Sequence, residues 1–398
     1  MTIELNVYHT IAIAIVILIA GEAIRNRVMV LQKYCIPVPV VGGLLCTVII
    51  LIGHETGAFE IKFDMAFKDF FMLLFYSGIG FTASWKLLKK GGPQVIIFLI
   101  ISSVVVVFQN LLGVGLSKLM GIDPLIGLAT GSIPMTGGHG TSAAFAPVLE
   151  EAGLANANTI SLAAATFGLV AGSLIGGPTG RFLIEHYHLK SSDAAAVSVK
   201  LDDKELGKAS GGSSERALTV GAYQLLIAVS LGCLVSDLLA KTGLSFPASV
   251  GGMTAAIIRN IADNTDRLKL RLPEISIISN ISLLIFLALS MMTLKLWQLA
   301  DLAVPMLLLL LAQTLLMFVC AVFITFKFMG KTYDAAMIAV GHCGFGLGAV
   351  PTAMANMQSV EAKYGQSPDA FFIVPLVGSL FINLVNTFVI TGFVNFLK

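Results

Sequence analysis

Ten apolar stretches, each close to the roughly 20 residues that a helix needs to cross a bilayer, constrain this chain more than any other feature. They lie near residues 8–24, 36–53, 66–83, 94–118, 157–180, 217–240, 246–262, 275–292, 302–326 and 370–394. Backbone N–H and C=O groups must be paired inside lipid, so stretches of this kind fold as helices. The sequence therefore predicts an all-α polytopic membrane protein.

Composition supports the same class and excludes others. Hydrophobic residues make up 56% of the chain and charged residues only 12%, against roughly 25% charged residues in soluble domains. The net charge of +2 is too small for a nucleic-acid partner, so the expected partners are membrane lipid and a small solute. The chain contains no HExxH, GxSxG or P-loop motif, so we expect neither an enzyme nor an ATP-driven pump, and no cofactor beyond a coupling ion.

The two halves of the chain resemble each other. Gly43 in a Val-Gly-Gly segment aligns with Gly252, 209 residues later, and Gly121 aligns with Gly330 at the same distance. Between the halves the chain turns polar and rich in Gly and Ser, as in a solvated linker. The predicted organisation is an N-terminal membrane repeat at 1–185, a linker at 186–216 and a C-terminal membrane repeat at 217–398, with five spans in each repeat.

Basic residues predict the orientation in the membrane. With the N-terminus outside, most of the Lys and Arg residues fall in inside segments, and the exceptions are Lys62, Lys68, Lys118, Lys241, Lys295 and Lys398. The positive-inside rule then puts both termini outside and the linker inside. An odd number of spans in each half makes the two repeats inverted, as in many secondary transporters.

Two Gly-rich segments of moderate hydrophobicity interrupt the pattern, at about 122–150 and 334–360. Broken backbone at membrane depth must be buried or line a cavity, so we expect two re-entrant hairpin loops that meet near the midplane. Their side chains can form hydrogen bonds or coordinate a cation: Ser132, Thr136, His139, Thr141, Ser142, His342, Cys343, Thr352 and Asn356. A carboxylate would suit the glycine N–H groups at Gly137, Gly138, Gly140, Gly344 and Gly346, and sodium would suit carbonyls and hydroxyls. Alternatively, the glycines only allow helices to cross closely.

Other polar residues lie within apolar spans. Asn383 and Asn386 share a helix face and can offer carbonyls to a cation, as can Asn280 beside several serines. Gln109 and Asn110 are similar, and for all of them interhelical hydrogen bonds are the alternative. His139 and His342 with Cys343 have no third ligand at metal spacing, so hydrogen bonding is favoured over a metal site. With no carboxylate central in a span, sodium coupling is favoured over proton coupling.

Long blocks of the sequence resemble the bacterial sodium/glutamate symporter family over essentially the whole length. The blocks are IPVPVVGGLL at 36–45, MTGGHGTSAAFA at 135–146, TFGLVAGSLIGGPTGRFL at 166–183, LKLWQLADLAVPML at 294–307 and YDAAMIAVGHCGFGLGAVPTAMANMQ at 333–358. The resemblance implies a sodium-coupled L-glutamate importer of the inner membrane, a homodimer, and elevator-like movement of a transport domain. It implies a translocation site at Gly137, Gly138, His139, Gly140, Thr141, Gly341, His342, Gly344, Phe345, Gly346 and Gly348. Where a family member carries an acidic residue in the last span, this chain has Asn383, so a cation site there is neutral.

The resulting hypothesis is sodium-coupled uptake of L-glutamate by alternating access, with periplasmic termini and a cytoplasmic linker. Substrate is expected at the translocation-site residues named above together with Thr136, Thr352 and Asn356, and sodium at Ser132, Asn280, Asn383 and Asn386. A carrier of another di- or tricarboxylate is one alternative, because no residue plainly recognises the α-amino group. A passive channel is another, because paired Gly-rich loops also build selectivity filters.

Overall fold

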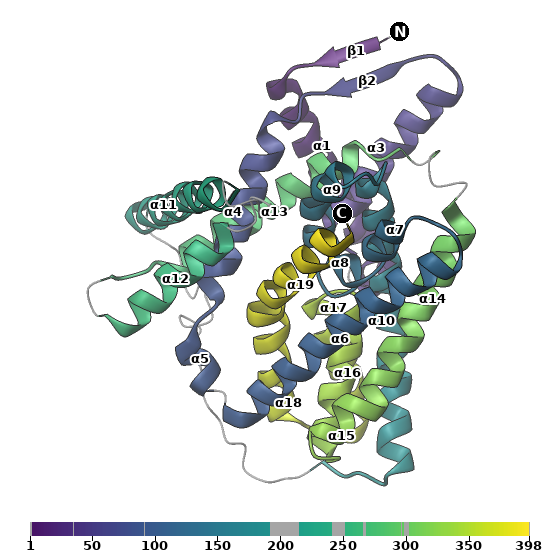
Figure 1. Ribbon diagram of the computed structural model, residues 1–398, viewed down its shortest axis with the longest axis vertical. Coiled ribbons are helices and arrows are strands. Elements are labelled where there is room, and N and C mark those ends of the chain that lie inside the picture. Colours follow the sequence, from purple (N-terminus) through teal and green to yellow (C-terminus); the bar gives the residue numbers. More distant parts are fainter. Residues whose placement is uncertain are drawn as a thin grey trace. The chain divides into compact units, whose positions relative to one another are not determined.

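The computed structural model describes residues 2–34, 36–90, 92–191, 215–240, 251–265, 268–295, 297 and 302–397. Almost all of these residues are helical, which confirms the predicted all-α membrane class. The chain divides into two compact units (Figure 1). Unit 1 comprises Met1–Ser84 and Leu201–Leu302, and unit 2 comprises Trp85–Lys200 and Ala303–Lys398. Each half of the sequence therefore contributes helices to both units.

In its described residues, unit 1 contains six long helices, the short helix α2 and a two-stranded sheet. Its elements are β1 (Thr2–Leu5), α1 (Val7–Arg27), α2 (Met29–Lys33), α3 (Val38–Glu55), β2 (Glu60–Phe63), α4 (Ala66–Thr82), α11 (Glu215–Ala240), α12 (Gly251–Asn264) and α13 (Leu272–Met292). The strands are parallel, with Thr2 paired to Glu60 and Leu5 to Phe63. The helices approach closely at small residues: a Cβ on Gly80 of α4 would lie 1.9 Å from the Gly252 carbonyl oxygen of α12.

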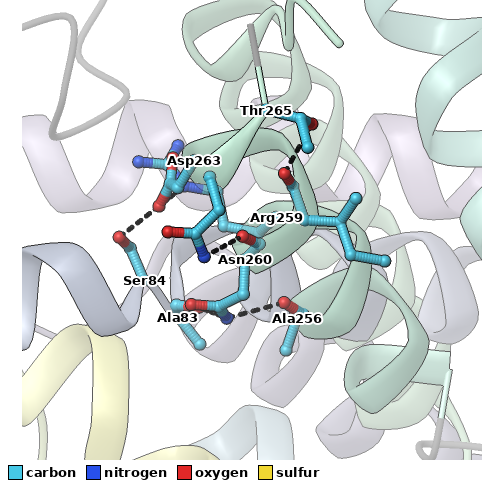
Figure 2. Close-up of polar contacts among 9 residues, drawn as sticks. Ala83, Ser84, Ala256, Arg259, Asn260, Asp263 and Thr265 are labelled. Carbon is cyan, nitrogen blue, oxygen red and sulfur yellow. Dashed lines mark hydrogen bonds and ion pairs between the residues drawn. The ribbon is translucent and has the colours of Figure 1, made fainter. Parts of the chain in front are cut away.

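A polar cluster joins the end of α4 to α12 in unit 1 (Figure 2). The Asn260 side-chain amide donates to the Ala83 carbonyl at 2.9 Å, and the Ser84 hydroxyl donates to Asp263. Arg259 forms an ion pair with Asp263 at 3.0 Å, and their side chains are only 7% and 15% exposed. The last residues of the first segment of unit 1 are thus tied to α12, Ala83 through Asn260 and Ser84 through the Arg259–Asp263 pair.

Unit 2 contains the two interrupted segments. Its elements are α5 (Trp85–Lys90), α6 (Gly92–Leu119), α7 (Pro124–Ala129), α8 (Ser132–Met135), α9 (Gly138–Glu151), α10 (Ala157–His186), α14 (Ala303–Val319), η3 (Cys320–Thr325), α15 (Phe326–Phe328), α16 (Tyr333–Leu347), α17 (Val350–Tyr364), α18 (Pro368–Pro375), η4 (Leu376–Phe381) and α19 (Ile382–Leu397). The two η elements are π-helical turns inside long helices. We call α7–α9 the first hairpin and α16–α17 the second hairpin.

Eight helices in the described residues are long and apolar enough to cross a membrane: Val7–Arg27, Val38–Glu55, Gly92–Leu119, Ala157–His186, Glu215–Ser236, Leu272–Met292, Ala303–Phe328 and Pro368–Leu397. Two of the ten predicted spans, 66–83 and 246–262, form helices shorter than these eight. Helix α4 has 17 residues, and α12 has 14 and carries the buried Arg259–Asp263 pair. The predicted span 246–262 also begins in residues that lie outside the described ranges.

Helix bounds in the second half follow those in the first at close to the 209-residue offset of Gly43 and Gly252. Helix α6 (92–119) corresponds to α14–α15 (303–328), and α10 (157–186) corresponds to α18–α19 (368–397). The first and second hairpins also occupy equivalent places in the order of elements. The inverted orientation of the repeats stays a prediction, and most of the predicted linker lies outside the described residues.

Candidate functional site

The breaks in the two hairpins lie against each other within unit 2. In the first hairpin the chain breaks between α8 and α9, where Gly138 has φ +63°, a conformation that favours glycine. In the second it breaks at Gly348 and Ala349, between α16 and α17. A Cβ on Gly138 would lie 3.0 Å from the Gly348 carbonyl oxygen. We call residues 136–141 the first tip and residues 346–352 the second tip.

Each tip contains the N-terminus of a helix of substantial length, α9 with 14 residues and α17 with 15. The first N–H groups of a helix have no partner within it and carry partial positive charge, so they attract anions. In α9 these groups belong to Gly138, His139 and Gly140, because the first bond within the helix runs from the Thr141 N–H to the Gly137 carbonyl. Two of the glycines predicted to face a carboxylate, Gly138 and Gly140, therefore stand where free donors occur.

The other three glycine N–H groups proposed as carboxylate donors are placed differently. The Gly137 N–H donates to the Ser132 carbonyl at 3.0 Å. Gly344 and Gly346 lie inside α16, which continues to Leu347, so their N–H groups face the carbonyls of the preceding turn. This part of the expectation is corrected: the helix runs up to the break, and its C-terminal end offers carbonyls instead of donors.

Close packing explains several of the predicted glycines. A Cβ on Gly344 would lie 2.3 Å from the Ala353 Cα, so any side chain would separate α16 from α17. Gly341 is similarly enclosed by Met357 and Val374, and Gly346 by Met317. The alternative interpretation, in which glycine permits close helix crossing, therefore applies to these three positions.

Thr352 is the side chain in the second tip with unused hydrogen-bonding capacity. It is the third residue of α17 and fully buried. Within the part of the chain that the structure describes, its hydroxyl has no hydrogen-bond partner. Asn356, one turn later, instead donates to the Gly172 carbonyl of α10 at 2.9 Å. A buried polar group without a partner carries a free-energy cost, which a bound ligand would remove.

Gln109 of α6 contacts both tips. Its side-chain N–H donates to the Gly346 carbonyl at 2.7 Å, and its side-chain oxygen accepts from the Thr136 hydroxyl at 2.8 Å. Gln313 of α14 donates to the main-chain carbonyl of Gln109 at 2.7 Å. From the sequence, Gln109 was a candidate for cation coordination or for an interhelical hydrogen bond, and Gln313 was not a candidate. A single glutamine within the apolar run LLLLLAQTLL was the available signal.

Ser132 and Asn386, both predicted near sodium, contact each other directly. The Ser132 hydroxyl donates to the Asn386 side-chain oxygen at 2.7 Å, and the Asn386 amide donates to the Ser132 carbonyl at 3.0 Å. The Ser132 N–H donates to the Asn110 side-chain oxygen at 2.9 Å. Asn383 is half-buried nearby on α19, and its carbonyl accepts from Thr387.

Asn280, the fourth residue predicted near sodium, belongs to a different compact unit from the other three. It belongs to α13 of unit 1, whereas the other three belong to unit 2, and its side chain is exposed. Two of the serines near it in sequence, Ser279 and Ser282, are buried, whereas Asn280 is not. The candidate site of unit 2 therefore does not include Asn280.

The two histidines form separate hydrogen bonds. His139 Nε2 lies 3.0 Å from the Thr166 hydroxyl, which itself donates to the Leu162 carbonyl, so the imidazole is the donor. His342 Nδ1 lies 2.8 Å from the Thr325 hydroxyl, and its ring stacks on Phe345. In the described ranges no group of three or more His, Cys, Asp or Glu side chains is placed to hold a metal ion.

Comparisons with known proteins agree with the helical membrane character of the chain. The family model described as "Sodium/glutamate symporter" matches residues 3–366. The chain is 40% identical over 391 residues to the sodium/glutamate symporter of Escherichia coli strain K12, covering 97% of each protein. It is 39% identical over 393 residues to that of Haemophilus influenzae, covering 97% of this chain and 96% of the relative.

A solved structure of the sodium proton antiporter MjNhaP1 from Methanocaldococcus jannaschii is similar to 98% of this chain, at 16% identity and a TM-score of 0.41. The family match spans both hairpins and most of both sequence halves, and the relatives match over nearly their whole length. The chain belongs to the sodium/glutamate symporter family.

Proposed function

We propose that this chain imports L-glutamate together with sodium across the bacterial inner membrane by alternating access. The family and the names of the relatives support the solute and the ion. The observation that carries the proposal in the structure is the meeting of two helix N-termini at the tips, with the unpartnered Thr352 hydroxyl beside one of them. Such a site favours a carboxylate.

Sodium requires oxygen ligands, and unit 2 offers them close to the same breaks. The C-terminal end of α16 presents carbonyls, and the Ser132, Asn386 and Asn110 cluster supplies hydroxyl and amide oxygens. The half-buried Asn383 on α19 adds a further carbonyl oxygen to this region. Neutral oxygens suit a monovalent cation without bringing a buried carboxylate into the site.

Charge balance sets a minimum for coupling. Glutamate carries one negative charge at neutral pH, so inward transport gains from the membrane potential only with at least two sodium ions. Each net positive charge moved inward is worth about 2.3 kcal/mol per 100 mV.

We propose that unit 2 is the moving part, because it carries both hairpins, and that unit 1 is the scaffold of a homodimer. Periplasmic termini and a cytoplasmic linker belong to the same proposal.

The test is initial uptake of labelled L-glutamate into proteoliposomes, with a sodium gradient and then with potassium in place of sodium. Concentrative, saturable uptake that requires sodium supports the proposal. Uptake that never exceeds the outside concentration would indicate a channel. Sodium-dependent uptake of labelled citrate or succinate, with no uptake of glutamate, would indicate another carboxylate.

Thr352→Val tests the site within the same assay. Valine keeps the shape of threonine and removes the hydroxyl, so the KM for glutamate should rise about tenfold if that hydroxyl binds the solute. Thr314→Val on α14 is the control, because the Thr314 hydroxyl bonds to the Leu310 carbonyl of its own helix. An unchanged KM in Thr352→Val would remove Thr352 from the site.

A further inference from the structure

We propose that Gln109 is a positioning residue that holds the two hairpin tips at the separation needed to bind the solute. This inference rests on the proposed function, because it concerns the same site. Gln109 is fully buried near the C-terminal part of α6, a helix that belongs to neither hairpin. Its two side-chain hydrogen bonds, to Gly346 at 2.7 Å and from Thr136 at 2.8 Å, are named the Gln109 bridge.

The bridge joins two points next to the helix N-termini. Thr136 directly follows α8, two positions before α9 begins at Gly138. Gly346 is two positions before Gly348, whose carbonyl oxygen faces Gly138. A shift at either end of the bridge therefore moves backbone that faces the other tip.

A carboxamide satisfies both ends of the bridge. Thr136 contributes a hydroxyl donor and Gly346 contributes a carbonyl acceptor, so the group between them needs one acceptor and one donor. A glutamate would set an anionic oxygen against the Gly346 carbonyl, and a leucine would leave both groups buried without partners. The amide orientation is thus set by its two neighbours.

The main chain at Gln109 is also held in place. Gln313 of α14 donates to the main-chain carbonyl of Gln109 at 2.7 Å, so α6 and α14 are tied at the residue that contacts both tips. The hairpins themselves supply few such constraints at their ends, since Gly138, Gly346 and Gly348 have no side chains. Alignment of the tips consequently depends on a third element, and loss of the bridge should weaken binding more than folding.

The first measurement is hydrogen–deuterium exchange by mass spectrometry on detergent-purified protein without glutamate. In Gln109→Leu, exchange should become faster in peptides that cover residues 136–141 and in those that cover 346–352. In Thr136→Val, which removes only one end of the bridge, faster exchange should appear in the first tip alone. Ser103→Ala on α6 is the matched control, because its hydroxyl bonds to the Leu99 carbonyl of its own helix.

The second measurement is the dissociation constant for L-glutamate at saturating sodium. Loss of one or two buried hydrogen bonds should raise it about tenfold in Gln109→Leu, with the same direction in Gln109→Glu. Thr136→Val should add little to Gln109→Leu, because both changes remove the same bond. Ser103→Ala should bind like the unmodified protein.

Exchange at both tips that matches the unmodified protein, in a folded Gln109→Leu variant, would overturn the bridge. An additive effect of Thr136→Val would overturn it as well. Failure of the unmodified protein to bind glutamate would instead overturn the proposed solute, and the exchange experiment would still decide whether Gln109 aligns the tips.

Discussion

Gly113 and Gly127 touch where α6 crosses α7 of the first hairpin. A Cβ on Gly113 would lie 2.2 Å from the Gly127 carbonyl oxygen, and a Cβ on Gly127 would lie 2.3 Å from the Gly113 carbonyl carbon. The obstacle on each side is backbone, which cannot rotate away as a flexible side chain can. This contact brings α7 and the first hairpin against the helix that carries Gln109 and Asn110. The position of the first tip therefore depends on having glycine, with no side chain, at both positions.

Gly113→Ala should therefore lower both the melting temperature and the rate of glutamate uptake, because α6 and α7 must separate to admit the methyl group. Gly115→Ala, two residues along the same helix, is the control: a Cβ there meets nothing within 4 Å. Alanine is the better helix former by about 1 kcal/mol, so Gly115→Ala should be neutral or slightly stabilising. Scanning fluorimetry and uptake assays measure both effects, and equal melting temperatures in the two variants would contradict the argument.

At the scale of elements, the two hairpins differ in what supports them. Both π-helical turns of unit 2 pack against α16: the Thr325 hydroxyl of η3 bonds to His342, and Gly378 of η4 lies against the Phe345 ring. The corresponding helices of the first half, α6 and α10, contain no such turn in their described residues. Insertions of this kind occur often at functional sites. The second hairpin therefore packs against two π-helical turns as well as against the regular helix α10.

In unit 1, helix α12 contains the buried ion pair of Arg259 and Asp263, which should stabilise the fold. Asp263→Asn would leave the Arg259 charge buried without its partner, and the free energy of unfolding should fall by about 3–5 kcal/mol. Glu4→Gln, which breaks the exposed Lys62–Glu4 pair, should change it by less than about 1 kcal/mol, since those side chains are 61% and 75% exposed. Denaturant unfolding in detergent compares them. Arg259→Met combined with Asp263→Asn should recover part of the loss; no recovery would show that charge is not the cause.

At the scale of the whole molecule, the two sequence repeats and the two compact units divide the chain differently. The predicted repeats split it near the middle, whereas the compact units each combine a segment from both halves. Unit 1 includes α1–α4 and α11–α13, and unit 2 includes α5–α10 and α14–α19. Both hairpins therefore belong to one unit, although more than 180 residues separate Gly138 from Gly348. This grouping is what an elevator-like movement requires under the proposed function.

Orientation in the membrane is a prediction at this scale. Fusion of alkaline phosphatase after Lys398 should give an active enzyme, because phosphatase folds only in the periplasm, and a green fluorescent protein at the same place should stay dark. The fluorescent protein inserted within the linker 186–216 should be bright, because the basic residues of that segment favour the cytoplasmic side. The reverse pattern would invert the topology and leave the helical fold unaffected.

Local properties of the sequence were enough for several conclusions. Apolar stretches determined the helical membrane class, because lipid leaves the backbone no other way to pair its polar groups. Gly-rich interruptions determined where the hairpins break, and the quoted blocks determined the family. The lengths of α4 and α12 could not be predicted in this way. Both helices are apolar in sequence, but their ends depend on contacts such as Asn260 with the Ala83 carbonyl.

The tertiary structure alone decided which polar residues share the site. Gln109, Asn280 and Asn383 look alike in sequence, each an amide within an apolar span. Packing buries Gln109 between two tips and leaves Asn280 exposed in the other unit. Likewise, Gly344 and Gly346 look like anion donors until α16 is seen to continue to Leu347. Hydrogen-bonding partners come from distant segments of the chain, and periodicity along one helix contains no information about them.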